Sequence, residues 1–148
     1  MAANSNPRFT KIGKISSTLV TAANTSSQGG GTVATDIFLA FTADATNGSF
    51  VERVRLVPTA TAATTTTATV ARVFVSSVAS GATTNANTYL VAEVTLPAIA
   101  ADNASTAVQP FDIPLGFALP ASGTILITNH AAPAANTAWR AVVIGGDY

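Results

Sequence analysis

The period of the apolar residues is the feature that most restricts the fold of this chain. Between residues 88 and 96 the side chains alternate, with Leu90, Ala92, Val94 and Leu96 in one set and Tyr89, Val91, Glu93 and Thr95 in the other. A period of two is typical of a β-strand with one face turned to a core, and we expect the first set to face inward. No stretch of the chain keeps the period of a helix, which excludes a helical bundle.

Similar segments recur at short spacing and are separated by residues that favour turns. Strands are expected over residues 12–21, 32–42, 50–57, 70–78, 88–96, 123–129 and 138–144. Pro58 is expected to end the third of these strands. Pro110, Pro114 and Pro120 should keep any strand among them short or at a sheet edge. Asn47-Gly48 is a hairpin signal, because both residues tolerate the positive φ of a type I′ turn.

About eight strands in 148 residues predict an all-β fold, a single-domain β-sandwich or jelly roll. The chain starts with polar residues and Pro7, so residues 1–13 are expected to form a flexible N-terminal arm. Residues 14–148 are then the sandwich domain. For residues 98–107 the sequence leaves a short helical turn and a loop as alternatives.

The chain carries little charge: charged residues make up 9%, against about 25% in an average soluble domain. The 30 Ala and 23 Thr have short side chains that lose little rotamer entropy when a partner covers them. This composition favours a component of an assembly over a weakly charged monomer. Because seven basic and seven acidic residues balance, nucleic acid is not an expected partner. The apolar runs are also far shorter than the roughly 20 residues of a membrane helix.

Residues that carry catalysis or bind metals are scarce. There is no Cys, and His130 is the only histidine, without a triad or zinc-binding motif around it. We expect His130 to lie in a surface loop. The seven carboxylates are scattered, and Gly29-Gly30-Gly31 lacks the Lys of a phosphate-binding loop. The sequence therefore predicts no catalytic residue, no metal, no cofactor and no enzymatic activity.

Arginine and tryptophan are enriched at protein interfaces, which directs attention to a few positions. The alternation places Arg53 and Arg55 on one strand face with Val51 and Val57, and Phe50, Val54 and Leu56 on the other. Either a neighbouring subunit covers such faces, or the arginines pair with carboxylates on a solvated sheet. The basic residues near the start either contact an acidic neighbour or stay solvated. The predicted interface residues are Arg8, Lys11, Lys14, Arg53, Arg55, Arg72, Trp139 and Arg140.

Several segments resemble small β-rich structural proteins of tailed bacteriophages. They are residues 47–58 (NGSFVERVRLVP), 68–75 (ATVARVFV), 92–97 (AEVTLP), 113–120 (IPLGFALP) and 142–148 (VVIGGDY). The likeness extends over most of the chain from Lys14 onward. It is a likeness of pattern and carries no catalytic signature.

The resemblance implies a virion component, with a capsid decoration or cement protein as the leading choice. Such a protein would lie on the outer surface of the capsid and bind the major capsid protein. It would form a homo-oligomer, with a trimer favoured, and the N-terminal arm would clasp a neighbour. The alternative is a receptor- or glycan-binding β-domain of the tail, neck or fibre. Its candidate aromatic platforms are Trp139, Tyr89 and Tyr148.

Overall fold

The computed structural model describes residues 10–101 and 109–148, and every regular element in them is a strand. Eight strands have five residues or more: β1 (Ile12–Val20), β3 (Phe38–Thr42), β4 (Ser49–Ala60), β6 (Thr69–Ser76), β8 (Thr88–Leu96), β10 (Phe111–Leu119), β11 (Thr124–Asn129) and β12 (Thr137–Asp147). Four have two residues: β2 (Gly31–Thr32), β5 (Thr64–Thr65), β7 (Ala82–Thr83) and β9 (Ala100–Ala101). The prediction of an all-β fold is confirmed.

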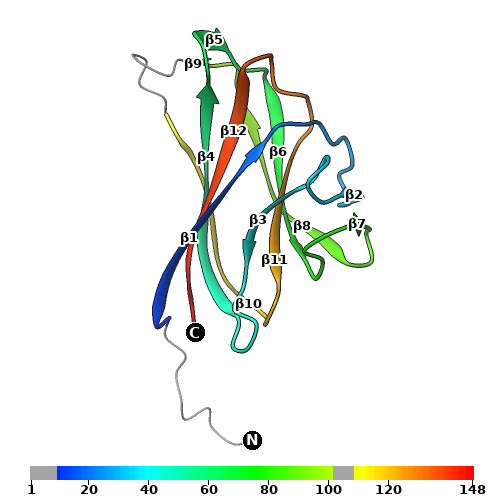
Figure 1. The fold of residues 1–148 in the computed structure, drawn as a ribbon, viewed down its shortest axis with the longest axis vertical. Coiled ribbons are helices and arrows are strands. Elements are labelled where there is room, and N and C mark those ends of the chain that lie inside the picture. Colours follow the sequence, from blue (N-terminus) through cyan, green and yellow to red (C-terminus); the bar gives the residue numbers. More distant parts are fainter. Residues whose placement is uncertain (1–9, 102–108) are drawn as a thin grey trace, which may run out of the picture.

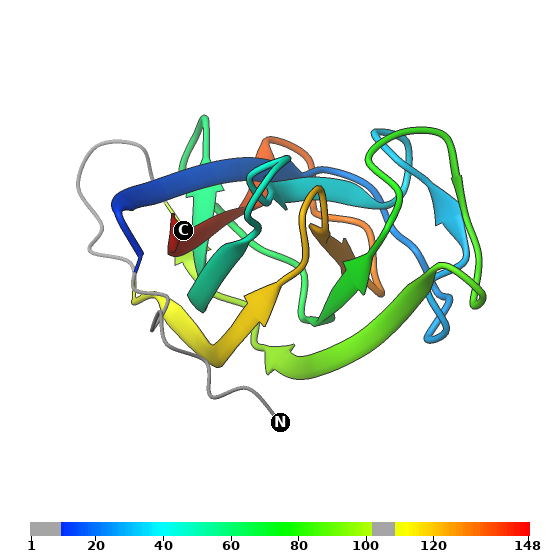
Figure 2. The same ribbon diagram turned by 90° about the horizontal axis from the view of Figure 1, so that it is seen from below.

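The long strands form two four-stranded antiparallel sheets. Sheet A has the order β1-β12-β4-β10, and sheet B has the order β3-β11-β6-β8. β1 lies beside β3 at one side of the molecule, and β10 lies beside β8 at the other (Figures 1 and 2). The two-residue strands add the small ladders β2–β7 and β5–β9.

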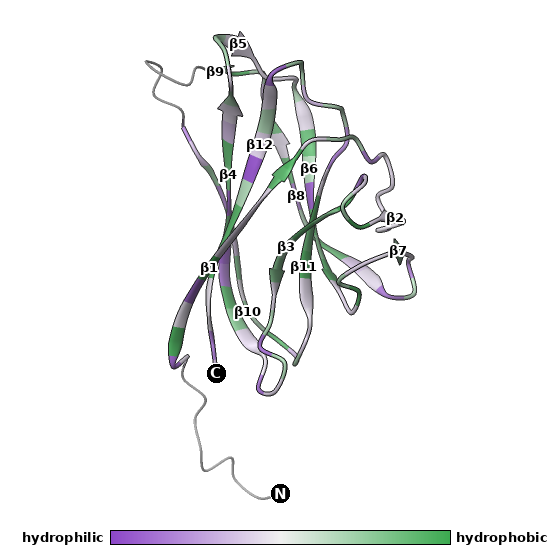
Figure 3. Ribbon diagram, viewed as in Figure 1, coloured by the Kyte–Doolittle hydropathy of each residue, from purple (hydrophilic) through white to green (hydrophobic). Residues whose placement is uncertain are grey.

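Side chains from both sheets fill the space between them. The fully buried members include Val51, Val54, Leu56, Ala141 and Val143 from sheet A and Ala71, Val73, Ile125 and Ile127 from sheet B. The hydropathy colouring shows hydrophobic residues along β3 and β11 (Figure 3). Trp139 belongs to this core, and its ring meets that of Phe111 edge to face, with 5.8 Å between the centroids.

Sheet B also buries part of its outer face. Phe74 and Leu126 lie on the face away from the main core and pack with Ile37, and all three are 0% exposed. Val33 and Leu39 pack against the same cluster. The short segment that follows β2 contains Val33 and Ile37, so this segment covers the middle of the sheet.

Side chains of β1 close the side of the molecule where β1 meets β3. Lys14 Nζ donates to the carbonyl oxygen of Thr42 at 2.8 Å and lies 3.1 Å from both carboxylate oxygens of Asp147. Ser16 Oγ donates to the carbonyl oxygen of Ala40. Because Ala40 and Thr42 lie on β3, an edge strand, these bonds cover carbonyl groups that would otherwise be open to another chain.

β-Bulges change which residues share a face. Successive residues of β12 pair with Val51 and with Arg53, so Glu52 is an extra residue in β4. The bulge turns Val51 into the core, and the prediction that it lies beside Arg53 is wrong. β8 has an extra residue, Val91, opposite β6. Leu90 next to it is 39% exposed, although the alternation placed it inward.

The prediction that Pro58 ends its strand is also wrong, because β4 continues to Ala60. Pro58 pairs with Trp139 of β12, but on the other side of β4 the partner strand β10 reaches only as far as Leu56. A proline is tolerated where one side of a strand has no partner, since no ladder bond is lost there. β10 itself lies at the edge of sheet A, as its prolines indicated, but it is nine residues long.

Asn47-Gly48 forms a turn but not a hairpin. The turn links β3 of sheet B to β4 of sheet A, and these two strands do not pair. Gly48 has a φ of 79° and donates its N–H to the carbonyl oxygen of Asp44 at 3.2 Å, whereas Asn47 does not have a positive φ. A Cβ on Gly48 would lie 2.3 Å from the carbonyl oxygen of Leu119, so this position requires glycine.

Ile12 and Gly13, which the prediction assigned to an arm over residues 1–13, belong to β1. Residues 1–9, with Arg8, lie outside the described residues. Of the segment 98–107, Ala100 and Ala101 form β9, and residues 102–107 are outside the described part.

Candidate functional site

The structure brings three of the predicted interface residues to one surface, the outer face of sheet A. On β4, Arg53 and Arg55 alternate with Val54 and Leu56, which point into the core. Arg140 lies on the adjacent β12, next to the core residue Trp139. The alternation of the two strands therefore turns all three guanidinium groups to the same side.

Apolar side chains separate these arginines. The register aligns Ile15 of β1, Ile144 of β12 and Arg53 of β4 in one row across the sheet. A second row aligns Leu19, Arg140 and Val57. The two β1 residues are the most open to solvent, with Ile15 71% exposed and Leu19 39% exposed. The outer face of sheet A is thus a mixed surface of arginine and branched aliphatic side chains.

Asp112 of β10 holds two of the arginines in place. Arg55 Nε and Nη2 donate to Asp112 Oδ1 and Oδ2 at 2.7 and 2.8 Å, a bidentate pair. Arg53 Nη1 lies 4.0 Å from Asp112 Oδ2, and Arg53 Nη2 lies 3.4 Å from Glu52. The hydrogen bonds from Arg55 hold the pKa of Asp112 below its ordinary value, so this carboxylate stays charged.

Arg140 differs from its neighbours because it forms no ion pair with any described residue. It lines a hollow of about 370 Å³ together with Leu19, the end of β4 with Thr59, and the start of β12 with Thr137. An exposed guanidinium without a carboxylate partner among the described residues is available to a carboxylate of another molecule.

The two described lysines of the predicted set lie away from this face. Lys14 points toward β3 and is held by Asp147 at the β1–β3 side. Lys11 comes just before β1, and its backbone N–H donates to the carbonyl oxygen of Asp147. Neither lysine belongs to the arginine rows.

Arg72 lies on sheet B and forms a cluster of its own. Its Nε donates to Glu93 Oε1 at 2.6 Å, and its Nη1 lies 3.5 Å from His130 Nδ1. Arg72 is only 8% exposed, so this guanidinium is a buried structural group in the isolated chain. His130 is exposed in the bend after β11, at the surface where the sequence placed it.

Trp139 is 1% exposed and packs in the core, so its ring offers no surface to a partner in this structure. The sequence reasoning instead missed Ile15, Leu19 and Asp112. Ile15 and Leu19 are four positions apart on a segment expected to be a strand, which puts them on one face. Nothing in the sequence paired Asp112 with Arg55, because 57 residues separate them.

The outer face of sheet A presents guanidinium, carboxylate and branched aliphatic side chains. The described residues contain no group of three or more His, Asp or Glu side chains that could hold a metal ion. In the same residues no helix has the length and apolar character needed to cross a membrane. Mixed arginine and aliphatic side chains form the kind of surface that contacts another protein.

Comparison with known proteins returned no relative: no family model, no curated protein and no solved structure matches the chain.

Proposed function

We propose that the chain is a non-enzymatic structural protein of a tailed-phage virion. The role that we favour is that of a capsid decoration protein on the outer surface of the head. In this proposal the outer face of sheet A binds the major capsid protein and stabilises the shell. The protein acts as a homo-oligomer, with a trimer favoured. The proposal starts from the resemblance of the sequence, and the surface of sheet A gives it a physical basis.

The architecture that we propose is a jelly roll. If only the eight long strands are numbered along the chain, sheet A has the order 1-8-3-6 and sheet B the order 2-7-4-5. The pairs 1–8, 2–7, 3–6 and 4–5 are those of one long antiparallel hairpin wrapped into two sheets. Viral capsid and lectin domains use this architecture. A fold alone does not define a function, so the strand order only supports the proposal.

The observation that carries the proposal is the composition of the outer face of sheet A. Solvated sheet faces usually carry polar side chains, whereas this face exposes Ile15 and Leu19 beside Arg140, which has no ion pair with any described residue. Arginine and large apolar groups contribute most of the binding energy at protein interfaces, while Lys and Glu are depleted there. The short Ala and Thr side chains that dominate the sequence add little entropic cost to docking.

A co-sedimentation experiment tests this proposal. Isolated heads and isolated tails of the phage that encodes the chain, both lacking the protein, are incubated with the purified chain. We expect the chain to sediment with heads, and Ile15→Asp to weaken this binding at least about tenfold, because burying a lone carboxylate costs more than 1.4 kcal/mol. Thr95→Asp, also on an exposed strand position but on sheet B, is the matched control. Sedimentation with tails only, or equal binding by both variants, contradicts the proposal.

One observation favours a second candidate, a glycan-binding domain of the tail, neck or fibre. Of the three aromatic platforms considered, Trp139 is buried, Tyr148 is half-buried and Tyr89 is 58% exposed at the edge of a pocket. A glycan array decides between the candidates. Binding that Tyr89→Ala abolishes and Ile15→Asp leaves intact supports the glycan-binding domain.

A further inference from the structure

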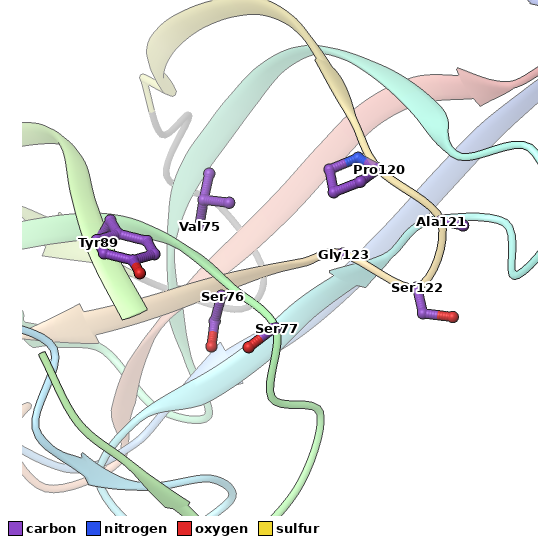
Figure 4. A pocket seen from close by; sticks show the side chains of 8 residues that line it. All are labelled: Val75, Ser76, Ser77, Tyr89, Pro120, Ala121, Ser122 and Gly123. Carbon is purple, nitrogen blue, oxygen red and sulfur yellow. The ribbon is translucent and has the colours of Figure 1, made fainter. Parts of the chain in front are cut away.

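A pocket of about 240 Å³ lies at one end of sheet B, away from the arginine rows (Figure 4). The end of β6, the start of β8 and the turn between β10 and β11 form its walls. The lining residues are Val75, Ser76, Ser77, Tyr89, Pro120, Ala121, Ser122 and Gly123. Figure 4 shows the rings of Tyr89 and Pro120 on opposite sides, with Val75 between them.

The size and chemistry of the pocket fit one apolar ring. An apolar cavity of about 150 Å³ holds a benzene molecule, and sites for larger ligands start at about 300 Å³. No charged or amide side chain lines the pocket, so it has no group that would bind vicinal sugar hydroxyls in pairs. A single aromatic or aliphatic side chain is therefore a better occupant than a saccharide.

Two details hold the pocket in shape before anything binds. The hydroxyl of Tyr89 donates to the carbonyl oxygen of Ala86 at 2.9 Å, which fixes the direction of the ring. Ser122 has a φ of 60°, an uncommon conformation for a residue other than glycine, in a turn closed by the Gly123 N–H and the Pro120 carbonyl oxygen at 3.0 Å. Residues held in such conformations cluster at binding sites.

The strand that carries Tyr89 has a free edge. β8 pairs with β6 on one side and with no described strand on the other. Tyr89, Leu90 and Val91 are three consecutive exposed residues there, at 58%, 39% and 42%. Edge strands usually carry charges or prolines that block pairing, and β8 has only Glu93. An extended peptide can add to such an edge by backbone hydrogen bonds and insert a side chain into a neighbouring pocket.

The chain itself has one segment suited to this edge, residues 1–9. Phe9 is the only phenylalanine outside the described residues, so no place in the core is assigned to its ring. The first carboxylate of the chain is Asp36, which leaves the N-terminal segment positively charged. Asp44, whose carbonyl oxygen accepts from the Ser122 N–H at 3.1 Å, lies next to the pocket. Hydrogen bonds from the backbone N–H groups of Asn47 and Thr46 lower the pKa of Asp44, so it presents a negative charge.

Thr10, which directly follows residues 1–9, lies beside sheet A, because a Cβ on Gly146 of β12 would lie 2.9 Å from the Cβ of Thr10. β8 is the far edge of sheet B, opposite the side where β1 meets β3.

We propose that residues 1–9 of a neighbouring copy lie along the free edge of β8 and place Phe9 in the pocket between Tyr89 and Pro120. The contact is head to tail, because the donated segment and the accepting edge are different surfaces, and it closes into a ring if the rotation between copies allows. This inference rests on the homo-oligomer of the proposed function but not on the capsid as its partner.

Chemical cross-linking between separately labelled copies tests the contact. The chain contains no Cys, so every thiol product comes from an introduced residue. An Arg8→Cys chain is mixed with a Ser77→Cys chain and treated with a short bis-maleimide. We expect a covalent dimer of the two different chains. The matched control replaces Ser77→Cys with Ser17→Cys, an equally exposed serine on sheet A, and should give background levels only.

Phe9→Ser, introduced into the Arg8→Cys chain, tests the role of the ring. Loss of the buried phenyl group should weaken the association about tenfold to a hundredfold and reduce the cross-link accordingly. Equal cross-linking to Ser77→Cys and Ser17→Cys, or a product unaffected by Phe9→Ser, overturns the inference. So does a cross-link within one copy when Arg8→Cys and Ser77→Cys are combined in a single chain. If the mass in solution still shows an oligomer in those cases, the proposed function stands without this contact.

Discussion

Trp139 and Arg140 are neighbours on β12, and their side chains point to opposite faces of sheet A. Replacing each residue in turn therefore distinguishes an effect on stability from an effect on binding. Trp139 packs in the core against Phe111, whereas Arg140 lies on the outer face of sheet A. We predict that Trp139→Ala destabilises the fold and that Arg140→Ala leaves it nearly unchanged. The effect on head binding should be the reverse, once both variants are compared under conditions where they are folded.

The magnitudes follow from the burial of the two residues. Replacing a core tryptophan by alanine costs about 3–5 kcal/mol. Trp139 Nε1 is buried and has no hydrogen-bond partner among the described residues, so its removal also relieves a desolvation cost of about 1–3 kcal/mol. We therefore expect the low end, about 3 kcal/mol, out of a total free energy of unfolding of about 7–20 kcal/mol for a domain of this size. Arg140→Ala should change the free energy by at most about 0.5 kcal/mol.

Urea denaturation followed by far-UV circular dichroism measures both effects. Fluorescence is unsuitable, because Trp139 is the only tryptophan and Trp139→Ala removes it. With an m-value of about 2 kcal/mol/M, the midpoint for Trp139→Ala should fall by about 1.5 M and that for Arg140→Ala by less than about 0.3 M. A midpoint shift below about 0.5 M for Trp139→Ala, or above about 1 M for Arg140→Ala, would refute the assignment of faces on β12.

Three further outcomes follow from individual contacts. Gly48→Ala should destabilise the fold by more than Gly81→Ala in urea denaturation; both have a positive φ, but only Gly48 has backbone within 3 Å of the added Cβ. Lys14→Met should lower the free energy of unfolding by about 1–2 kcal/mol and the exposed Lys11→Met by much less, because only Lys14 bonds to the edge of β3. The pKa of Asp112 is lower in the folded protein than its unfolded value of about 3.9, so the ionised carboxylate stabilises the fold above that pH. This stabilisation is lost as the pH falls through the pKa of the folded state. In acid denaturation below about pH 4, Asp112→Asn should therefore lose stability less steeply than wild type. An equal loss in both proteins contradicts a contribution of Asp112 to the pH dependence of stability.

The alternation of apolar residues was enough to place most of the strands. β8 begins and ends at the residues expected from the pattern, and β1 and β11 differ from the expected ranges by one residue at one end. Periodicity works here because one face of each strand must be buried, and a shift of one residue would reverse the faces. Arg53 and Arg55 were placed on one face for the same reason.

The errors arise where pairing between distant strands decides the outcome. The bulge at Glu52, which turns Val51 inward, exists only because β12 pairs with β4. Pro58 continues a strand because β10 stops short of it. Asn47-Gly48 has the local chemistry of a hairpin, but the chain crosses to the other sheet at that turn. None of these relations is a property of neighbouring residues in the sequence.

In the candidate interface, too, some features follow from local sequence and others depend on distant parts of the chain. Its arginines could be found from residue type and strand period, while Trp139 was predicted as an interface residue because tryptophan is enriched at interfaces. The alternation on β12 places Trp139 with Ala141 and Val143, which are both fully buried. Which face of a strand turns to the core depends on the opposing sheet, and that information is absent from a single strand.

A reconstruction of the native virion tests the central claim most directly. It shows whether the protein occupies the head, under which symmetry, and which of its faces is covered. We predict density for this fold on the outer surface of the capsid, with the outer face of sheet A, including Ile15 and Arg140, in contact with the major capsid protein. Density confined to the tail, or a head-bound copy whose outer face of sheet A is turned to solvent, would contradict the account.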